Sequence, residues 1–597
     1  MRGGGSITNV SRTSRRTHLC GELRAEHVGQ RVRLGGWVHR RRDLGGILFI
    51  DLRDRAGIVQ VAIGPGAPED VRRVATGLGS ESVVEVEGQV TARPANMKNP
   101  ELATGDVEVQ ATALTLVGPA VTPAIPVARG KGEELPAEEL RLKYRHLDLR
   151  RPEMQASLTL RHRLLQRARR TLSDLGFLEI ETPILTKPTP EGARDYLVPS
   201  RVHPGEFYAL PQSPQIYKQL LMVSGFDRYF QIARCFRDED LRNDRQPEFT
   251  QIDLEASFVG MEDVLGYVEA VLADLWDEGA GHKVARPFPR MTWRDAMERY
   301  GSDKPDLRYD LQIVDWTAHV KPLAVPFFQS ALKDGVRVRG LAVKGGGALS
   351  RKDVDQLADT AKQLGGAGLA WVKRQGEQIS GSVGKHFTAE ALGGIGVGDG
   401  DVGLMTVGPD RVTSPVLDRV RQEVIQRLGV TPKFAHAFTW VVDFPLFQPD
   451  PETGQPVFAH HPFTAPHPDD VARLDSDPFS CRALHYDAVY NGNELGSGSI
   501  RITDPVVQRR VFARLGLSQA DIEARFGFLL NGLQAGAPPH GGFAIGFDRT
   551  VMVLAGVGSL RDVIAFPKTT TARALFEGAP APANPADLAA LHIEVKR

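Results

Sequence analysis

The chain has 597 residues, enough for several domains with separate cores. Lys plus Arg and Asp plus Glu are equal at 73 each, so net charge indicates no nucleic-acid partner, and any such partner must be held by local patches. The three cysteines lie far apart without a CxxC pair, which argues against a disulfide framework and favours a reducing, cytoplasmic location. No run approaches the roughly 18 apolar residues of a membrane span, and the basic, Gly- and Ser-rich residues 1–17 are expected to be a disordered leader.

Residues 18–118 are expected to form a small closed β-barrel, with the OB type among the candidates. Apolar residues alternate from Arg31 to about Leu116 in five short runs separated by Gly-rich or polar turns. If the apolar neighbours of Phe49 and Gln60 point into the barrel, these two residues point out. An outward ring can stack a base, an amide can read a base edge, and arginines at 40–42 can hold phosphate. An ordinary exposed Phe and a solvated Arg run are the alternative for each residue taken alone.

A hinge and a helix follow the barrel. Residues 119–151 are rich in Pro, Gly, Ala and charge, as linkers are. A helix is predicted from about Pro152 to Leu175, with Gly176 just beyond its end. Its arginines could face RNA or be a solvated helix face. The segment FLEIETPILT, with Pro183, comes next.

The stretch from Phe230 to Glu255 predicts two strands joined by a long, almost wholly polar connection. Arg237 ends the first strand, and Gln251 and Asp253 share one face of the second. A hairpin that turns Arg, Gln and Asp into one space suits an anionic or zwitterionic ligand. A salt-bridged surface hairpin is the alternative.

Two carboxylates and two histidines stand out later in the chain. Asp487 and Glu494 flank a predicted turn, and such a pair suits Mg²⁺ held partly by substrate phosphates, although a structural turn with caps is the alternative. His460 and His461 are neighbours in an extended segment, so they point to opposite faces and rarely share a metal. In Gly546-Phe547-Asp548-Arg549, small residues let a nucleotide approach the backbone, and Arg549 supplies a fixed charge for phosphate.

These segments together resemble the class II aminoacyl-tRNA synthetases. FRDE followed by RQPEFTQID resembles their motif 2, the helix with FLEIETPILT resembles motif 1, and GFDR resembles motif 3. The segment GWVHRRRDLGGILFIDLRDRAG is similar to the anticodon-binding domain of bacterial aspartyl-tRNA synthetases. The ordered set is identified as a member of the bacterial-type aspartyl branch, in subclass IIb.

The resemblance implies an α+β multidomain fold. It consists of an N-terminal OB-type β-barrel, a class II catalytic core of antiparallel sheet and helices, and an inserted α+β domain whose function does not follow from the sequence. The expected divisions are a disordered basic leader (1–17), an anticodon-binding domain (18–118), a hinge (119–151), the first part of the core (152–308), the inserted domain (309–430), the second part of the core (431–575) and a C-terminal extension (576–597).

The resemblance also implies a function. It is ATP-dependent ligation of L-aspartate to the 3′ end of its tRNA through an aspartyl-adenylate, with Mg²⁺, in a homodimer that has Pro183 at its interface. The catalytic residues implied are Arg237, Glu239 and Arg549. Aspartate contacts are implied at Glu191, Ser213, Gln215, Lys218, Arg237, Gln251, Asp253, His460 and Arg501. ATP contacts are implied at Arg237, Asp238, Glu239, Gln246, Glu494, Gly546, Phe547, Asp548 and Arg549, the metal ligands are Asp487 and Glu494, and the anticodon contacts are Arg42, Leu44, Phe49 and Gln60.

Selection of aspartate over asparagine is assigned to Lys218 and Arg501. Both are hydrogen-bond donors without acceptor capacity, so an amide would present its NH₂ to a cation. A site built for a charged partner can reject the neutral isostere by a factor on the order of 10⁴. Leu44 leans toward aspartate tRNA alone, since relatives that also charge asparagine tRNA often carry His there.

Four alternatives remain. Asparaginyl and lysyl synthetases share the barrel-plus-core plan, but Lys218 and Arg501 would repel the ammonium of lysine. An RNA-binding protein with a relict core is disfavoured by the intact Arg237, Glu494 and Arg549. An ammonia-using asparagine synthetase on the same core is disfavoured by the barrel.

Overall fold

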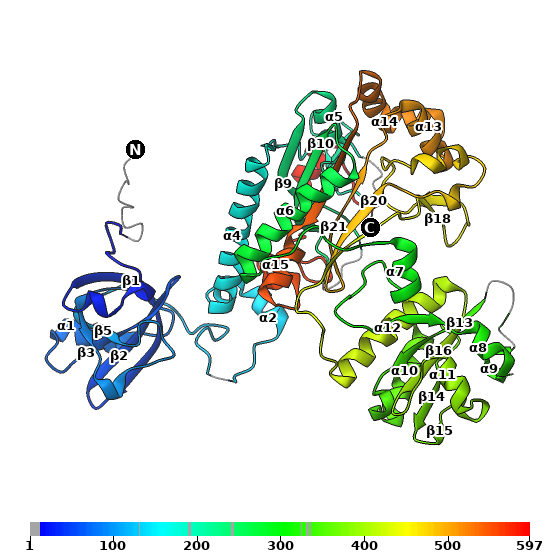
Figure 1. Ribbon diagram of the computed structural model, residues 1–597. Coiled ribbons are helices and arrows are strands. Elements are labelled where there is room, and N and C mark those ends of the chain that lie inside the picture. The colour runs from blue at the N-terminus through cyan, green and yellow to red at the C-terminus, as the bar shows by residue number, and fades with distance from the viewer. Residues whose placement is uncertain are drawn as a thin grey trace, which may run out of the picture. The chain divides into compact units, whose positions relative to one another are not determined.

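The computed structural model describes residues 12–130, 132–188, 193–239, 244–323, 325–329, 332 and 336–596 (Figure 1). The chain divides into two compact units. Unit 1 comprises Met1–His162, Leu241–Gln246 and Ala555–Ala583, and unit 2 comprises Arg163–Asp240, Pro247–Leu554 and Asn584–Arg597. In the described ranges no helix has the length and apolar character needed to cross a membrane.

Unit 1 contains a closed five-stranded barrel with strand order β1–β2–β3–β5–β4. Its elements are β1 (Arg31–Leu44), β2 (Ile47–Asp54), β3 (Gly57–Ile63), α1 (Glu69–Gly77), β4 (Val83–Ala92) and β5 (Val107–Gly118). The inward residues of the alternating runs form its core, among them Leu48, Ile50, Leu52, Val59 and Val61. Phe49 and Gln60 are half-buried between these core positions. The predicted barrel and the predicted in–out alternation are confirmed.

The leader and hinge contain more structure than expected. Residues 12–17 are described, and the Thr17 amide donates to the Arg33 carbonyl of β1 at 2.8 Å. Residues 1–11 lie outside the described part. The hinge region contains α2 (Glu138–Lys143) and α3 (Arg145–Asp148). Arg145 is buried, where it pairs with Asp148 at 2.6 Å and donates to the Ala565 carbonyl at 2.8 Å. The predicted long helix is α4 (Pro152–Asp174).

Unit 2 is built on an eight-stranded sheet with strand order β11–β17–β20–β21–β22–β10–β9–β6. The strand pairs are antiparallel except for the edge pairs β11/β17 and β6/β9. The strands are β6 (Leu178–Glu179), β9 (Arg228–Phe236), β10 (Glu248–Ser257), β11 (Arg290–Thr292), β17 (Phe438–Val442), β20 (His485–Tyr490), β21 (Asn493–Ile500) and β22 (His540–Gly546). The predicted hairpin is β9–β10, which pairs in continuous register.

Helices and small hairpins accompany this sheet (Figure 1). They are β7 (Leu197–Pro199), β8 (Phe207–Ala209), α5 (Gln215–Val223), α6 (Met261–Ala280), α7 (Trp293–Tyr300), β18 (Phe447–Pro449), β19 (Pro456–Phe458), α13 (Pro505–Arg514), α14 (Gln519–Gln534), α15 (Phe547–Ala555) and α16 (Pro585–Ala590). The buried stripe of α6 includes Trp276, which packs on Phe438 and Tyr490 with ring centroids 4.9 and 4.7 Å apart. β17 and β20 are buried along their whole length. Charged side chains that are buried beside such strands lie in a low-dielectric interior.

A second, five-stranded antiparallel sheet lies within residues 309–430, with strand order β12–β13–β16–β14–β15. Its elements are β12 (Ile313–Asp315), α8 (Thr317–Val320), α9 (Pro326–Gln329), β13 (Arg337–Val343), α10 (Arg351–Gln363), β14 (Ala370–Gln375), β15 (Gln378–Ser380), α11 (Ala389–Gly394), β16 (Val402–Gly408) and α12 (Asp410–Leu428). It has two hydrophobic clusters of its own, one containing Leu341, Leu404 and Leu417 and the other containing Trp316, Val372 and Leu392.

Candidate active site

Four charged side chains form a buried cluster beside the central strands of unit 2. Lys218 comes from α5, Asp253 and Glu255 from β10, and Arg501 from the residue after β21, and each is at most 3% exposed. The Lys218 ammonium donates to Asp253 Oδ1 at 2.6 Å and lies 3.2 Å from Glu255 Oε2. Arg501 holds Glu255 with two hydrogen bonds, from Nε to Oε1 at 2.8 Å and from Nη2 to Oε2 at 3.0 Å. Two cations and two carboxylates compensate one another, which is what allows charges to be buried here.

Glu255 is a member of this cluster that the sequence did not assign. It lies two residues after Asp253, so the strand period puts both carboxylates on one face of β10. The adjacent strand β22 has Gly542 opposite Glu255, and a Cβ at Gly542 would overlap the Glu255 carboxylate. The two-residue spacing therefore indicated in the sequence that Glu255 shares a face with Asp253. The sequence did not indicate which cations Glu255 pairs with.

The two carboxylates differ in their acidity. Burial opposes ionisation of Glu255, but Arg501 and Lys218 outweigh it and lower the pKa of Glu255 to about 2. Burial raises the pKa of Asp253 above its usual value, although Lys218 opposes the shift. Among the described residues, Asp253 Oδ2 and Gln215 Nε2 are buried without a hydrogen-bond partner. A buried acceptor and a buried donor that both lack partners suit a ligand with an ammonium and a carboxylate.

The two adjacent histidines have different partners, as predicted for neighbours in an extended segment. His461 Nε2 accepts a hydrogen bond from Arg501 Nη1 at 2.8 Å, so His461 joins the charge cluster, which the sequence did not indicate. His460 stacks on His485 with ring centroids 3.5 Å apart. Burial lowers the pKa of His460 to about 4 and that of His461 well below its usual value, so both rings are neutral near pH 7.

The arginines predicted to bind nucleotide follow two strands, β9 and β22, that both pair with β10. Arg237 follows β9, and its guanidinium lies 5.1 Å from the Phe249 ring centroid, while its Nε has no hydrogen-bond partner within the described ranges. Gly546 at the end of β22 is opposite Gln251 of β10, and Arg549 on α15 donates to the Glu494 carbonyl at 2.8 Å. The register of β9, β10 and β22 thus gathers the segments that resemble motifs 2 and 3.

Two of the residues in the GFDR segment have structural contacts. The Phe547 side chain is fully buried, and Asp548 Oδ2 accepts the Thr250 amide at 2.8 Å. In this segment Phe547 is packed in the interior, Asp548 is bonded to the β10 backbone, and the Arg549 guanidinium is held beside Glu494.

Asp487 and Glu494 lie on the β20–β21 hairpin, whose turn at Asn491 and Gly492 has two positive φ angles, 48° and 79°. Asp487 Oδ1 lies 2.9 Å from His485 Nε2. Burial and the nearby charges of Glu494 and Asp303 raise the pKa of Asp487 well above its usual range. Asp487 is buried and Glu494 is half-buried, and neighbouring carboxylates that repel one another fit a divalent cation with oxygen ligands. The described residues hold no group of three His, Cys, Asp or Glu that could hold a metal, so an ion here would need further oxygens from a substrate.

The remaining candidates are placed as follows. Ser213 Oγ accepts a hydrogen bond from the backbone N–H of Gln215 at 3.3 Å, and Gln251 Oε1 accepts one from Cys235 Sγ at 3.3 Å. The backbone N–H of Asp238 donates to the Arg194 carbonyl at 3.0 Å. Glu239 is half-buried. Gln246 belongs to unit 1, where its side-chain amide makes two hydrogen bonds with the Lys568 backbone, at 3.0 and 2.8 Å. Glu191 lies outside the described residues.

The outer face of the barrel brings three of the predicted RNA contacts together. Arg42 is opposite Phe49 across β1 and β2, and its Nη2 donates to Asp51 at 2.7 Å and to Gln60 Oε1 at 3.3 Å. The Gln60 amide donates to Glu108 at 2.7 Å, and Leu44 is 61% exposed. Arg40 and Arg41 instead donate to the backbone carbonyls of Arg129 and Thr76, so only Arg42 of this run lies with Phe49 and Gln60.

Comparison with known proteins agrees with this geometry. The family described as tRNA synthetases class II (D, K and N) matches residues 137–570, and the OB-fold nucleic acid binding domain matches residues 32–117. The aspartate–tRNA ligase of Geobacillus kaustophilus is 49% identical over 585 residues, 97% of this chain and 99% of that protein. The aspartate–tRNA(Asp/Asn) ligase of Bacillus subtilis is 47% identical over 587 residues, 98% of this chain and 99% of that protein.

The fold agrees with solved structures as well. The asparaginyl-tRNA synthetase of Pyrococcus horikoshii complexed with asparaginyl-adenylate superposes with a TM-score of 0.58 at 20% identity, covering 92% of this chain and 98% of that one. This likeness concerns the fold, while the sequence matches over nearly the full length define the branch. The chain therefore belongs to the class II tRNA synthetases of the aspartate, lysine and asparagine group, in the branch of the bacterial aspartate–tRNA ligases.

Proposed function

We propose that this protein ligates L-aspartate to the 3′ end of tRNA in an ATP-dependent reaction that passes through aspartyl-adenylate. The observation that carries the proposal is the buried cluster of Lys218, Asp253, Glu255 and Arg501, which combines two cations with an unsatisfied carboxylate oxygen. A small amino acid with two carboxylates and one ammonium group offers a partner for each kind of group in this cluster. The relatives named as aspartate–tRNA ligases support the same substrate.

In the first step the α-carboxylate of aspartate attacks the α-phosphorus of ATP, and pyrophosphate leaves. In the second, the terminal ribose hydroxyl of the tRNA attacks the activated carbonyl and AMP leaves. In-line displacement at phosphorus needs positioning and charge neutralisation more than covalent help. We assign Arg237 to the α-phosphate and the reacting carboxylate, and Arg549 to the γ-phosphate.

Other residues orient the substrates. Asp253 pairs the substrate ammonium through its Oδ2, with Gln215 beside it, and Ser213, Gln251, His460 and Glu191 complete the aspartate contacts. This assignment is supported by the orphaned Asp253 Oδ2, Gln215 Nε2 and His460 Nε2 among the described residues. Asp238, Glu239, Gln246 and the backbone at Gly546 are assigned to ATP.

Mg²⁺ belongs to the proposal as the cation that would be held by Asp487 and Glu494. When bound, it would neutralise phosphate charge that develops during displacement. The two carboxylates fit such an ion because they are the oxygen ligands that Mg²⁺ prefers, and substrate phosphates supply the rest.

We propose that selection of aspartate depends on donor geometry rather than on uncompensated cations. Lys218 and Arg501 are already paired with Asp253 and Glu255, so an amide substrate would not leave bare cations behind. Discrimination instead depends on donor geometry. Glu255, His461 and Ser499 hold the Arg501 guanidinium, and we assign its remaining Nη2 N–H to the substrate side chain, where an amide would offer one acceptor and one repelled donor.

We also propose that the barrel binds the anticodon through Arg42, Phe49 and Gln60, and that Leu44 restricts charging to aspartate tRNA. The relatives fall under two names, aspartate–tRNA ligase and aspartate–tRNA(Asp/Asn) ligase, so this point needs its own assay. Purified aspartate and asparagine tRNAs are offered to the wild type and to Leu44→His. Charging of only the aspartate tRNA by the wild type is expected, and equal charging of both would contradict the role of Leu44.

A cytoplasmic homodimer is part of the same proposal. Leu178, Ile184, Leu185, Leu197 and Phe207 are 41–56% exposed on the segments around Pro183, which supports an interface there. Sedimentation of the purified protein tests the dimer.

ATP–pyrophosphate exchange tests the function directly. Exchange that depends on aspartate, and not on asparagine or lysine, is expected, followed by aspartate charging of tRNA. Asparagine- or lysine-dependent exchange would identify one of the sister enzymes. Absence of exchange would favour an RNA-binding protein. Formation of free asparagine when ammonia is supplied would favour the amide-forming ligase.

A further inference from the structure

The loop of residues 301–308, which follows α7, reaches the predicted metal carboxylates from another part of the chain. Its Lys304 ammonium lies 3.1 Å from Glu494 Oε2, although 190 positions separate the two residues. The Lys304 side chain is 42% exposed and that of Glu494 is 28% exposed, so the pair lies at the edge of the site. The roles assigned above do not use Lys304.

The backbone of this loop is held where it touches the β20–β21 hairpin. A Cβ at Gly492 in the hairpin turn would lie 3.3 Å from the Asp306 Cβ and 3.8 Å from the Lys304 carbonyl oxygen, so the two segments are in close contact. The hairpin that carries Glu494 and the loop that carries Lys304 therefore pack as one surface.

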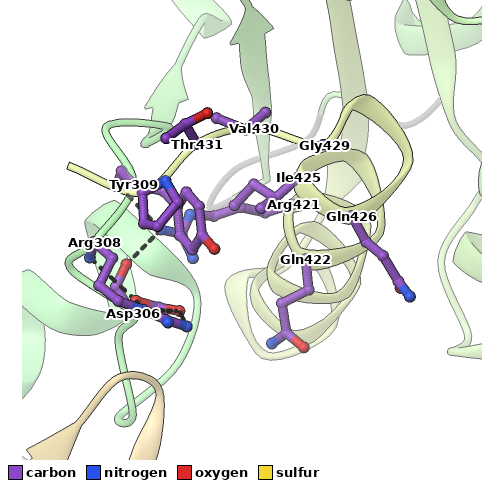
Figure 2. Close-up of a pocket in the computed structure, with 11 residues that line it drawn as sticks. Asp306, Arg308, Tyr309, Arg421, Gln422, Ile425, Gln426, Gly429, Val430 and Thr431 are labelled. Atoms are coloured by element: carbon purple, nitrogen blue, oxygen red, sulfur yellow. Dashed lines mark hydrogen bonds and ion pairs between the residues drawn. The ribbon is translucent and has the colours of Figure 1, made fainter. Parts of the chain in front are cut away.

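The far side of the loop is anchored to α12. Arg421 is 1% exposed, and its Nη2 donates to the Asp306 carbonyl at 2.7 Å, while Asp306 pairs with Arg308 at 2.7 Å. An open pocket of about 530 Å³ lies here, with Asp306 and Arg308 on one side and Gln422 of α12 on the other (Figure 2). Because the loop is held on both sides, Lys304 is presented to Glu494 by a fixed backbone.

Lys304 is also a cation that opposes the local negative charge. Asp303, Asp487 and Glu494 act on one another electrostatically, and Lys304 counteracts both Asp303 and Asp487. Burial lowers the pKa of Lys304, but Glu494 and Asp303 outweigh it, so the ammonium stays charged. An ammonium bound to a carboxylate oxygen competes with a metal ion for that oxygen.

We propose that Lys304 is a positioning residue of the nucleotide site that serves as the resident counter-ion of Glu494. It orients this carboxylate before the nucleotide binds and disfavours the binding of a free divalent cation, so that the metal enters together with the triphosphate. Phosphate oxygens add the ligands that two carboxylates lack, and they shift the competition in favour of the metal. This inference rests on the proposed function for the identity of the nucleotide.

Binding of Mn²⁺ to the nucleotide-free, full-length protein, followed by electron paramagnetic resonance, tests the proposal. Lys304→Met and Lys304→Gln should bind Mn²⁺ about five- to tenfold more tightly than the wild type, because they lose a partly screened competing charge. Lys304→Arg, which keeps the charge, should stay within about twofold of the wild type. Lys433→Met is the matched control, since Lys433 is an exposed lysine whose ammonium pairs with another carboxylate, Asp310, at 2.6 Å.

Two further measurements make the result specific. If the tighter Mn²⁺ binding of Lys304→Met is lost in the double variant Lys304→Met/Asp487→Asn, the Mn²⁺ ion is bound at the carboxylates. With a non-hydrolysable ATP analogue present, the affinity gain in Lys304→Met should shrink to less than about twofold. Unchanged or weaker Mn²⁺ binding in both folded Lys304→Met and Lys304→Gln would overturn the inference. Because these assays need neither aspartate nor tRNA, that failure is distinct from a wild type that shows no aspartate-dependent exchange.

Discussion

Replacement of Arg501 by leucine tests the charge cluster most directly. The change removes four hydrogen bonds: two to Glu255 at 2.8 and 3.0 Å, one to His461 at 2.8 Å and one to Ser499 Oγ at 2.5 Å. It leaves Glu255 with Lys218 as its remaining cation in the cluster. Loss of one partner of a buried ion pair costs about 3–5 kcal/mol of stability. A second contribution concerns the substrate, because a cation about 4 Å from a carboxylate at an effective dielectric of about 20 stabilises it by about 4 kcal/mol.

That second contribution predicts a fall of about 10³-fold in kcat/KM for aspartate. ATP–pyrophosphate exchange measures it, and the KM for ATP should change by less than about threefold because Arg237 and Arg549 remain. Arg339→Leu is a matched control for the stability effect: Arg339 is 1% exposed, lies on β13 and donates to Ser414 Oγ and to the Glu298 carbonyl, both at 2.7 Å. It should lower the melting temperature without changing kcat/KM for aspartate. The reasoning would be refuted if folded Arg501→Leu had the same kcat/KM for aspartate as Arg339→Leu.

Three further predictions concern other parts of the chain. Phe49→Ala should raise the KM for tRNA about tenfold, the lower range expected for loss of one stacking platform, and leave pyrophosphate exchange unchanged; loss of exchange in the folded variant would contradict a role confined to the barrel. Glu255→Gln should remove about 3 kcal/mol of unfolding free energy near pH 7, and, because the folded-state pKa of Glu255 is depressed from 4.5 to about 2, this difference from the wild type should be complete above about pH 4.5 and vanish as pH falls toward 2. Denaturant unfolding across this range checks it, and a difference that persists at pH 2 would show that the carboxylate charge is not the cause. Gly542→Ala should raise the KM for aspartate and lower the melting temperature, because its Cβ would overlap the Glu255 carboxylate, whereas Gly558→Ala, with open space at its Cβ position, should do neither.

The sequence by itself determined the local architecture of the site. Strand alternation gave the inward core of the barrel and the outward Phe49 and Gln60, and it put Gln251 and Asp253 on one face of a strand. The turn between Asp487 and Glu494 was also readable, because Asn-Gly in an alternating segment favours a two-residue hairpin. Such features depend on a repeat of two residues and on the φ angles of a few neighbours, so they are written within short segments.

Tertiary structure decided which charges meet. Glu255 lies between Lys218 and Arg501 because β10 is flanked by α5 and by the chain that leaves β21, and because Gly542 on the next strand leaves space for the carboxylate. His461 joins Arg501, and Lys304 reaches Glu494 across 190 positions. The charge of a side chain is visible in the sequence, but whether it is compensated depends on groups brought within about 3 Å by packing, and that packing is a property of the whole fold.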